Sequence, residues 1–146
     1  MRVMMIVKGT PEQEAAGMPA DAEKMFADMA VYNNELIAAG LMLDGVGLLP
    51  TKLGKKVRFA ARGDSMVIDG PFTETKELIG GYWLLKVKDM DEAIAWARRI
   101  PFDSGEVELR IVAEPESFGD LVTEEVKTQE QEWRAEQERR APKATA

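Results

Sequence analysis

Two segments of this chain are apolar on both of the faces that an extended strand presents. Residues 3–7 are all apolar, and residues 82–85 read Tyr-Trp-Leu-Leu. If Val3 and Trp83 face a core, four large side chains point to the opposite face: Met4, Ile6, Tyr82 and Leu84. An antiparallel sheet with one face in water alternates apolar and polar residues. Both faces of these strands therefore need a cover.

A second copy of the chain is the simplest cover for the remaining face. Burying a large apolar side chain stabilises a protein by roughly 1.5–3 kcal/mol, whereas an exposed salt bridge contributes about 0–1 kcal/mol. We therefore expect a homodimer whose sheets pack face to face. The alternative is that residues 119–140 fold back over this face, although that segment has few apolar residues. The tail could instead reach the partner subunit, with Trp133 as its anchor.

The spacing of apolar residues predicts the order of the elements. We expect helices from 19 to 39 and from 89 to 100, a polar loop over 9–17, and strands over 3–7, 41–49, 57–61, 65–68, 79–88 and 107–111. The 41–49 strand contains two glycines, which indicates a bulged edge strand. This order gives two strand–helix–strand halves with an inserted hairpin region, close to the ferredoxin-like plan.

The predicted fold class is therefore α+β, with a mainly antiparallel sheet and two helices on one face. After Pro115 the composition changes, and residues 119–140 are rich in Glu, Gln and Arg. We divide the chain into an α+β domain over 1–117 and a charged C-terminal helix with a frayed end over 118–146.

Composition excludes several kinds of chemistry. The chain has no cysteine and no histidine, so disulfides, the usual zinc sites and histidine acid–base catalysis are excluded. No metal and no cofactor is expected. A net charge of −7 disfavours nucleic acid as a partner. The apolar run at the start is too short for a signal peptide or a membrane span, and we expect a cytoplasmic protein.

The most distinctive stretch is the turn Asp69-Gly70-Pro71-Phe72. Asp69 has two interpretations, a turn residue that bonds backbone amides or a carboxylate that points from a strand end into a cleft. The first is favoured. Gly80 and Gly81 open the next strand, which indicates either a bulge or a close approach by a ligand or a partner chain.

Basic residues alternate with apolar ones on several of the predicted strands. Arg58, Arg62, Lys86 and Arg110 could line one sheet face and form a cleft for a small carboxylate or phosphate. Tyr82 could donate a hydrogen bond there. Alternatively, the basic residues lie on exposed edges and the tyrosine belongs to the core.

Residues 69–101 resemble the DGPF branch of the YCII-related family, through Asp-Gly-Pro-Phe at 69–72, Gly-Tyr-Trp at 81–83 and Asp-Glu-Ala at 91–93. The resemblance extends over about residues 1–113 and implies a dimeric α+β barrel. It also implies a catalytic His–Asp pair in a cleft. Since the chain has no histidine, Asp69 is the only residue that could correspond to a member of that pair. A further implication is an association with alternative sigma factors.

The leading hypothesis is a small cytoplasmic homodimer that binds a small molecule in a cleft near Asp69. The ligand is expected to be anionic if the arginines line that cleft. One alternative is a lyase or hydrolase in which Asp69 acts as general base. Another is an accessory protein in sigma-factor-linked transcription control. Whether the protein is an enzyme is left open.

Overall fold

The computed structural model describes residues 1–140, apart from the side chain of Arg62. Backbone contacts divide the chain into two compact units, Met1–Val112 and Ala113–Ala146. The first unit holds both sheets and the candidate site, and the second is helical. The frayed end that we predicted after residue 140 lies outside the described residues.

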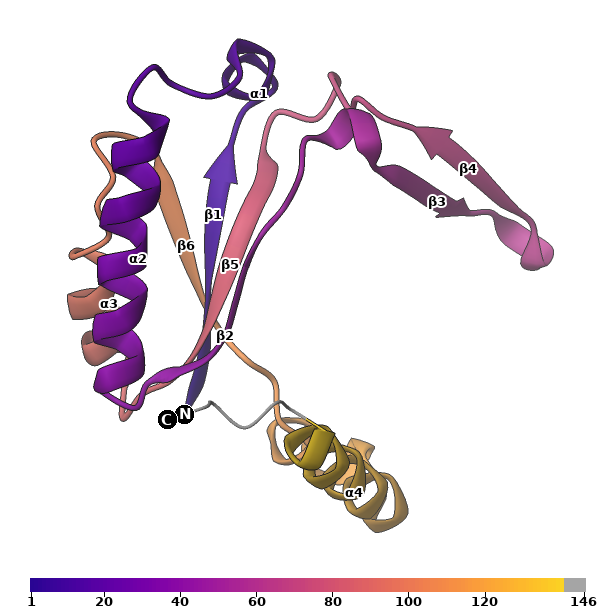
Figure 1. Ribbon diagram of the computed structural model, residues 1–146. Helices are drawn as coiled ribbons and strands as arrows, with labels where there is room; N and C mark the ends of the chain where they lie inside the picture. The colour runs from indigo at the N-terminus through magenta and orange to yellow at the C-terminus, as the bar shows by residue number, and fades with distance from the viewer. Residues whose placement is uncertain (141–146) are drawn as a thin grey trace. The chain divides into compact units, whose positions relative to one another are not determined.

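The main sheet of the first unit has four strands in the order β2-β5-β1-β6, and all three pairings are antiparallel. The strands are β1 (Arg2–Gly9), β2 (Met42–Gly47), β5 (Leu78–Lys86) and β6 (Glu106–Ile111). Two helices, α2 (Ala22–Ala38) and α3 (Met90–Ala97), lie on one face of this sheet (Figure 1). The predicted α+β, ferredoxin-like fold is confirmed.

The core lies between this sheet and its two helices. Val3 and Met5 of β1 are fully buried, and they belong to one cluster with Leu36 of α2. Aromatic rings join the layers: Tyr32 meets Trp83 edge to face, with ring centroids 5.7 Å apart. This arrangement explains the helical stripe in the sequence, because positions three and four apart share one helix face.

The opposite face of the sheet carries the other half of the two apolar strands. Met4 and Ile6 are half-buried on either side of the fully buried Met5 on β1, and Tyr82 and Leu84 are half-buried on either side of the buried Trp83 on β5. We call this surface, centred on these four side chains, the open face. The expectation that both strands are apolar front and back is therefore confirmed.

The two glycines of β5 have separate structural roles. Val7 pairs with Gly81 and Lys8 pairs with Ile79, so Gly80 is an extra residue in the ladder. A Cβ on Gly81 would lie 2.5 Å from the carbonyl oxygen of Val46. The bulge interpretation is confirmed, and the close approach is made by β2 of the same chain.

The segment predicted as a polar loop contains a short helix, α1 (Pro11–Ala16), so that prediction was wrong. Thr10 caps this helix: its side chain accepts a hydrogen bond from the amide of Gln13, and the Gln13 side chain accepts one from the amide of Thr10. The helix lacks an apolar stripe, and capping together with Pro11 in the first turn explains its formation.

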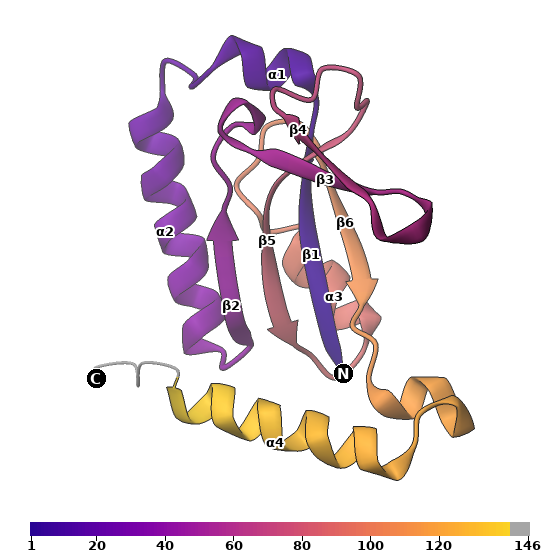
Figure 2. The same ribbon diagram turned by 90° about the vertical axis from the view of Figure 1, so that its right-hand side faces the viewer.

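The inserted hairpin forms a sheet of its own. Strands β3 (Lys55–Phe59) and β4 (Ser65–Asp69) pair only with each other, and the turn η2 (Ala61–Gly63) joins them. We call residues 55–69 the arm. It projects from the side of the main sheet opposite α2 and α3, and Figure 2 shows it in front of β5, β1 and β6.

The second unit consists of the turn η3 (Pro115–Leu121) and the helix α4 (Glu124–Arg140). Arg134 of α4 forms ion pairs with Glu114, before η3, and with Glu130, one turn earlier in the helix. No residue of α4 is buried. The predicted C-terminal helix is confirmed. Within the described part of the chain, no helix is both long enough and apolar enough to cross a membrane.

Candidate ligand-binding site

A cleft of about 580 Å³ lies where the arm joins the rest of the first unit. It is lined by residues of β3 and β4 and by the loop that follows them: Lys56, Arg58, Ile68, Asp69, Pro71, Phe72, Thr73, Glu74 and Thr75. We call it the turn cleft, because the Asp-Gly-Pro-Phe turn supplies part of its wall.

The first two turn residues close the arm and bring it against the preceding loop. Asp69 is the last residue of β4, pairs in register with Lys55, and forms an ion pair with it at 2.5 Å. The amide of Gly70 donates to the carbonyl of Gly54 at 3.0 Å. A Cβ on Gly70 would lie 1.7 Å from the carbonyl oxygen of Thr51. Only glycine therefore fits at this position.

A short chain of hydrogen bonds fixes the other end of the turn. Thr51 lies in η1 (Thr51–Leu53), and its amide and hydroxyl both donate to the carboxylate of Glu14 in α1. The Thr51 hydroxyl accepts a hydrogen bond from the amide of Phe72 at 3.3 Å. Helix α1 and the turn cleft are thereby connected through a single threonine.

The cationic side chains of the turn cleft lie on one face of the arm. Lys56 and Arg58 are two positions apart on β3, so both point to the same side. The Lys56 ammonium donates to the hydroxyl of Thr75 at 2.9 Å and lies 4.2 Å from the centroid of the Phe72 ring. These contacts hold one positive charge in the wall of the cleft.

The structure brings together only some of the residues that we predicted to form a site. Arg58 and Asp69 both line the turn cleft. Tyr82 and Arg110 lie on the open face, on β5 and β6, with β1 between them. Arg62 lies in η2, but its side chain is outside the described residues. The four basic residues that we expected on one sheet face do not share one, because Arg58 belongs to the separate sheet of the arm whereas Lys86 and Arg110 belong to the main sheet.

The two predicted residues on the open face are bound by neighbours in the same chain. The Tyr82 hydroxyl donates to Asp44 at 3.0 Å, and this hydrogen bond raises the pKa of the tyrosine. Arg110 pairs with Glu108 at 3.1 Å. A hydrogen bond from Lys8, followed by one from Arg110, lowers the pKa of Glu108. These side chains are engaged within the open face rather than directed at a cleft.

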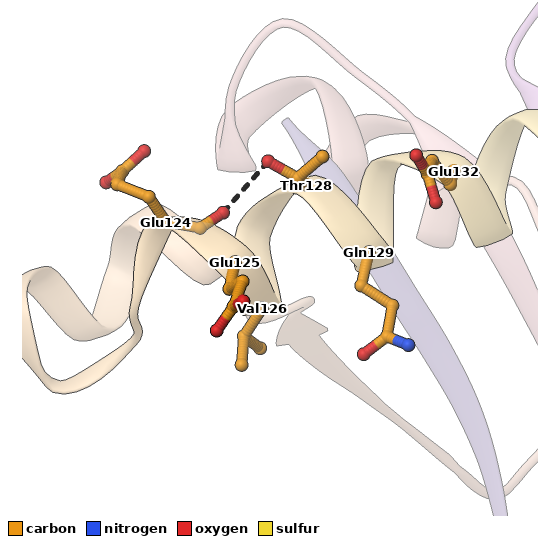
Figure 3. Close-up of a pocket in the computed structure, with 6 residues that line it drawn as sticks. All are labelled: Glu124, Glu125, Val126, Thr128, Gln129 and Glu132. Atoms are coloured by element: carbon orange, nitrogen blue, oxygen red, sulfur yellow. Dashed lines mark hydrogen bonds between the residues drawn. The ribbon is translucent and has the colours of Figure 1, made fainter.

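A second hollow, of about 620 Å³, lies along the first turns of α4. Figure 3 shows that its side chains diverge: Glu124 points to one side of the helix, whereas Glu125, Val126 and Gln129 point to the other. Since no groups converge there, this hollow is a weak candidate for a site. Among the described residues, no cluster of acidic side chains could hold a metal ion.

The comparison with known proteins agrees with the geometry of the first unit. Residues 1–116 match the YCII-related domain. This chain belongs to the YCII-related family. One YCII-related relative is an uncharacterized protein of Rhizobium meliloti strain 1021, which is 34% identical over 76 residues. The aligned stretch covers 52% of this chain and 60% of the relative.

Several residues that line or support the turn cleft of this YCII-related chain were not predicted from its sequence. Lys56 lies just before the strand predicted over 57–61 and was given no role, and Glu14, which supports the cleft through Thr51, was assigned to a loop. Thr75 was given no role either. One signal was available for the region around Glu14, because Thr10 followed three residues later by Gln13 is a capping-box pattern.

Proposed function

We propose that this YCII-related protein binds a small anionic molecule in the turn cleft. The observation that carries the proposal is the placement of Lys56 and Arg58 on one face of the arm, beside the ring of Phe72. Ammonium and guanidinium groups form strong, charge-assisted hydrogen bonds to carboxylate and phosphate. Lys56 is already oriented by Thr75, so less side-chain entropy is lost when a ligand binds.

The remaining lining defines the class of ligand further. Asp69 pairs with Lys55 on the opposite face of β3 from Lys56 and Arg58, whereas Glu74 places its carboxylate oxygens in the same lining as the two cations. These oxygens accept hydrogen bonds from a hydroxyl or amino group, and they repel a second negative group. The lining therefore favours a carboxylate or phosphate that also carries hydrogen-bond donors.

Ligand binding can be tested by a thermal-shift screen of small carboxylates and phosphates, followed by titration calorimetry of the best compound. Lys56→Gln and Arg58→Gln should each weaken binding by about tenfold or more, since each removes a charged partner. Lys76→Gln is the matched control, because this lysine lies in the same loop region but does not line the cleft. Equal affinity in all four proteins would contradict the proposal.

The proposal also covers the family branch, the oligomeric state and the cellular location of the protein. It assigns the chain to the DGPF branch, on the Asp-Gly-Pro-Phe turn, and to a cytoplasmic homodimer, on the apolar open face and the lack of cysteine. Replacing Ile6 of the open face with glutamate should convert a dimer to a monomer in sedimentation velocity. The sigma-factor association rests on resemblance alone, and a pull-down that uses the whole chain tests it.

A further inference from the structure

The arm is a two-stranded ribbon with little support from the rest of its own chain. Its strands pair with each other, and their contacts with the main sheet are sparse. Val57 and Val67 face each other across the ribbon, yet 52% and 61% of their surfaces are exposed, and Phe59 beside them is 82% exposed. Isolated two-stranded hairpins are marginally stable in water. This ribbon therefore needs a surface to pack against.

The charge of the arm indicates the nature of that surface. Residues 55–69 contain four basic and two acidic residues, a net charge of +2. Since the whole chain has a net charge of −7, the remaining residues carry −9. A second copy of the chain therefore offers the arm a strongly acidic partner, and complementary charge favours this association over that of unrelated neutral surfaces.

The direction of the arm points to the same partner. Figures 1 and 2 show the arm on the side of the main sheet that α2 and α3 leave uncovered. A second sheet stacked on that face would lie about 10 Å away. Any copy of the chain that packs on the open face therefore lies alongside the arm of its partner.

We propose that the arm clasps a second copy of this chain, with Val57, Phe59 and Val67 packed against the partner. This inference rests on the homodimer of the proposed function and names a second surface that holds it together. It has a consequence for the turn cleft, because Lys56 and Arg58 lie on the arm. The partner subunit steadies the ribbon that carries both cations, so dimer formation and anion binding strengthen each other.

Nucleic acid is the other partner that a basic ribbon could fit. Proteins contact phosphate groups through basic and polar side chains. Binding of the arm to nucleic acid would therefore leave the apolar side chains of Val57 and Val67 in water. The apolar face of the arm favours a protein surface, and the acidic remainder of the chain would repel a phosphate backbone.

The test is the mass of the full chain by sedimentation velocity over a range of concentrations. The double variant Val57→Glu/Val67→Glu should weaken the dimer by about tenfold or more, as expected for loss of a packed apolar contact. Val31→Glu, at a position that is 59% exposed on α2, is the matched control and should dimerise as the wild type does.

The outcomes separate this inference from the proposed homodimer. If the double variant dimerises like the wild type, the arm does not pack against the partner subunit, whereas the proposed homodimer is supported. If the wild type is a monomer throughout, both are wrong. Binding of the wild type to a short DNA duplex, lost in Lys56→Gln, with dimerisation unaffected by the double variant, would overturn the clasp in favour of nucleic acid.

Hydrogen exchange of the wild type provides a second measurement that does not depend on a folded variant. Amides of residues 55–69 should exchange about tenfold more slowly in the dimer than in the monomer at low concentration. In the monomer the arm is uncovered, so its backbone hydrogen bonds open readily. Core amides of β1 are the internal control and should not respond. Concentration-independent exchange of the arm, in a protein that does dimerise, would also overturn the clasp.

Discussion

Thr51 donates both its backbone amide and its hydroxyl to the carboxylate of Glu14, at 2.6 and 2.5 Å. The two residues are 37 positions apart in the sequence. Since the same hydroxyl accepts the amide of Phe72, a small surface helix restrains the turn that closes the arm. The shape of the turn cleft depends on this link as much as on the motif itself.

Removing the carboxylate of Glu14 should loosen the turn. In Glu14→Ala, two donors of Thr51 lose a charged acceptor, and we expect the free energy of unfolding to fall by about 1–3 kcal/mol. Glu12→Ala, at an exposed position of the same helix, should change it by less than about 0.5 kcal/mol. Urea denaturation measures both values. Equal values for the two variants would show that the link contributes nothing to stability.

Gly70→Ala should be among the most damaging single substitutions in the first unit. The new methyl group would overlap the carbonyl of Thr51, so either the turn or η1 must move, at a cost of about 3 kcal/mol or more. Gly47→Ala is a suitable control, because nothing lies within 4 Å of the Cβ position there. Thermal unfolding should separate the two variants clearly, and a wild-type melting temperature for Gly70→Ala would refute the packing argument.

Asp69→Asn distinguishes the structural interpretation of Asp69 from the enzymatic one. The side chains of Asp69 and Lys55 are 76% and 64% exposed, so loss of their ion pair should cost less than about 1 kcal/mol. Lys55→Gln removes the same pair from the other strand and should have an equal effect. If a hydrolase or lyase activity is found, its loss in Asp69→Asn alone, at unchanged stability, would favour the general-base hypothesis.

Tyr32 should make the fold sensitive to high pH. Its side chain is 3% exposed and donates to the carbonyl of Trp96, and burial raises its pKa to about 12. An unfolded tyrosine has a pKa of about 10, so the stabilisation is complete below that pH and is lost as the pH rises towards 12. The stability difference between wild type and Tyr32→Phe should therefore shrink by about 1.4 kcal/mol between pH 9 and 11.

Most elements of the first unit could be predicted from local patterns. The apolar alternation of β1 and β5, the stripe of α2 and the cap at Asp89 are all signals within one element. Helix α1 was missed because it buries no residue, so its sequence carries no apolar period. Its capping residues were the only remaining indication.

The site was harder to predict, because it depends on which strands pair. Arg58 and Arg110 show the same alternation in sequence, and nothing local reveals that one belongs to the arm and the other to the main sheet. Strand pairing is set by contacts distant in sequence. The contact between Glu14 and Thr51 also joins residues distant in sequence. The Asp-Gly-Pro-Phe turn could therefore be recognised from the sequence, whereas the contact that restrains it could not.

The extra residue at Gly80 determines which way the polypeptide enters β5. Side chains alternate between the two faces of a strand, so an inserted residue reverses the facing of everything before it. Leu78 is 8% exposed and Ile79 is 52% exposed because of this inversion. In a regular ladder, with Gly80 opposite Lys8, their environments would be exchanged, so that Ile79 would face the helices and Leu78 would lie on the open face.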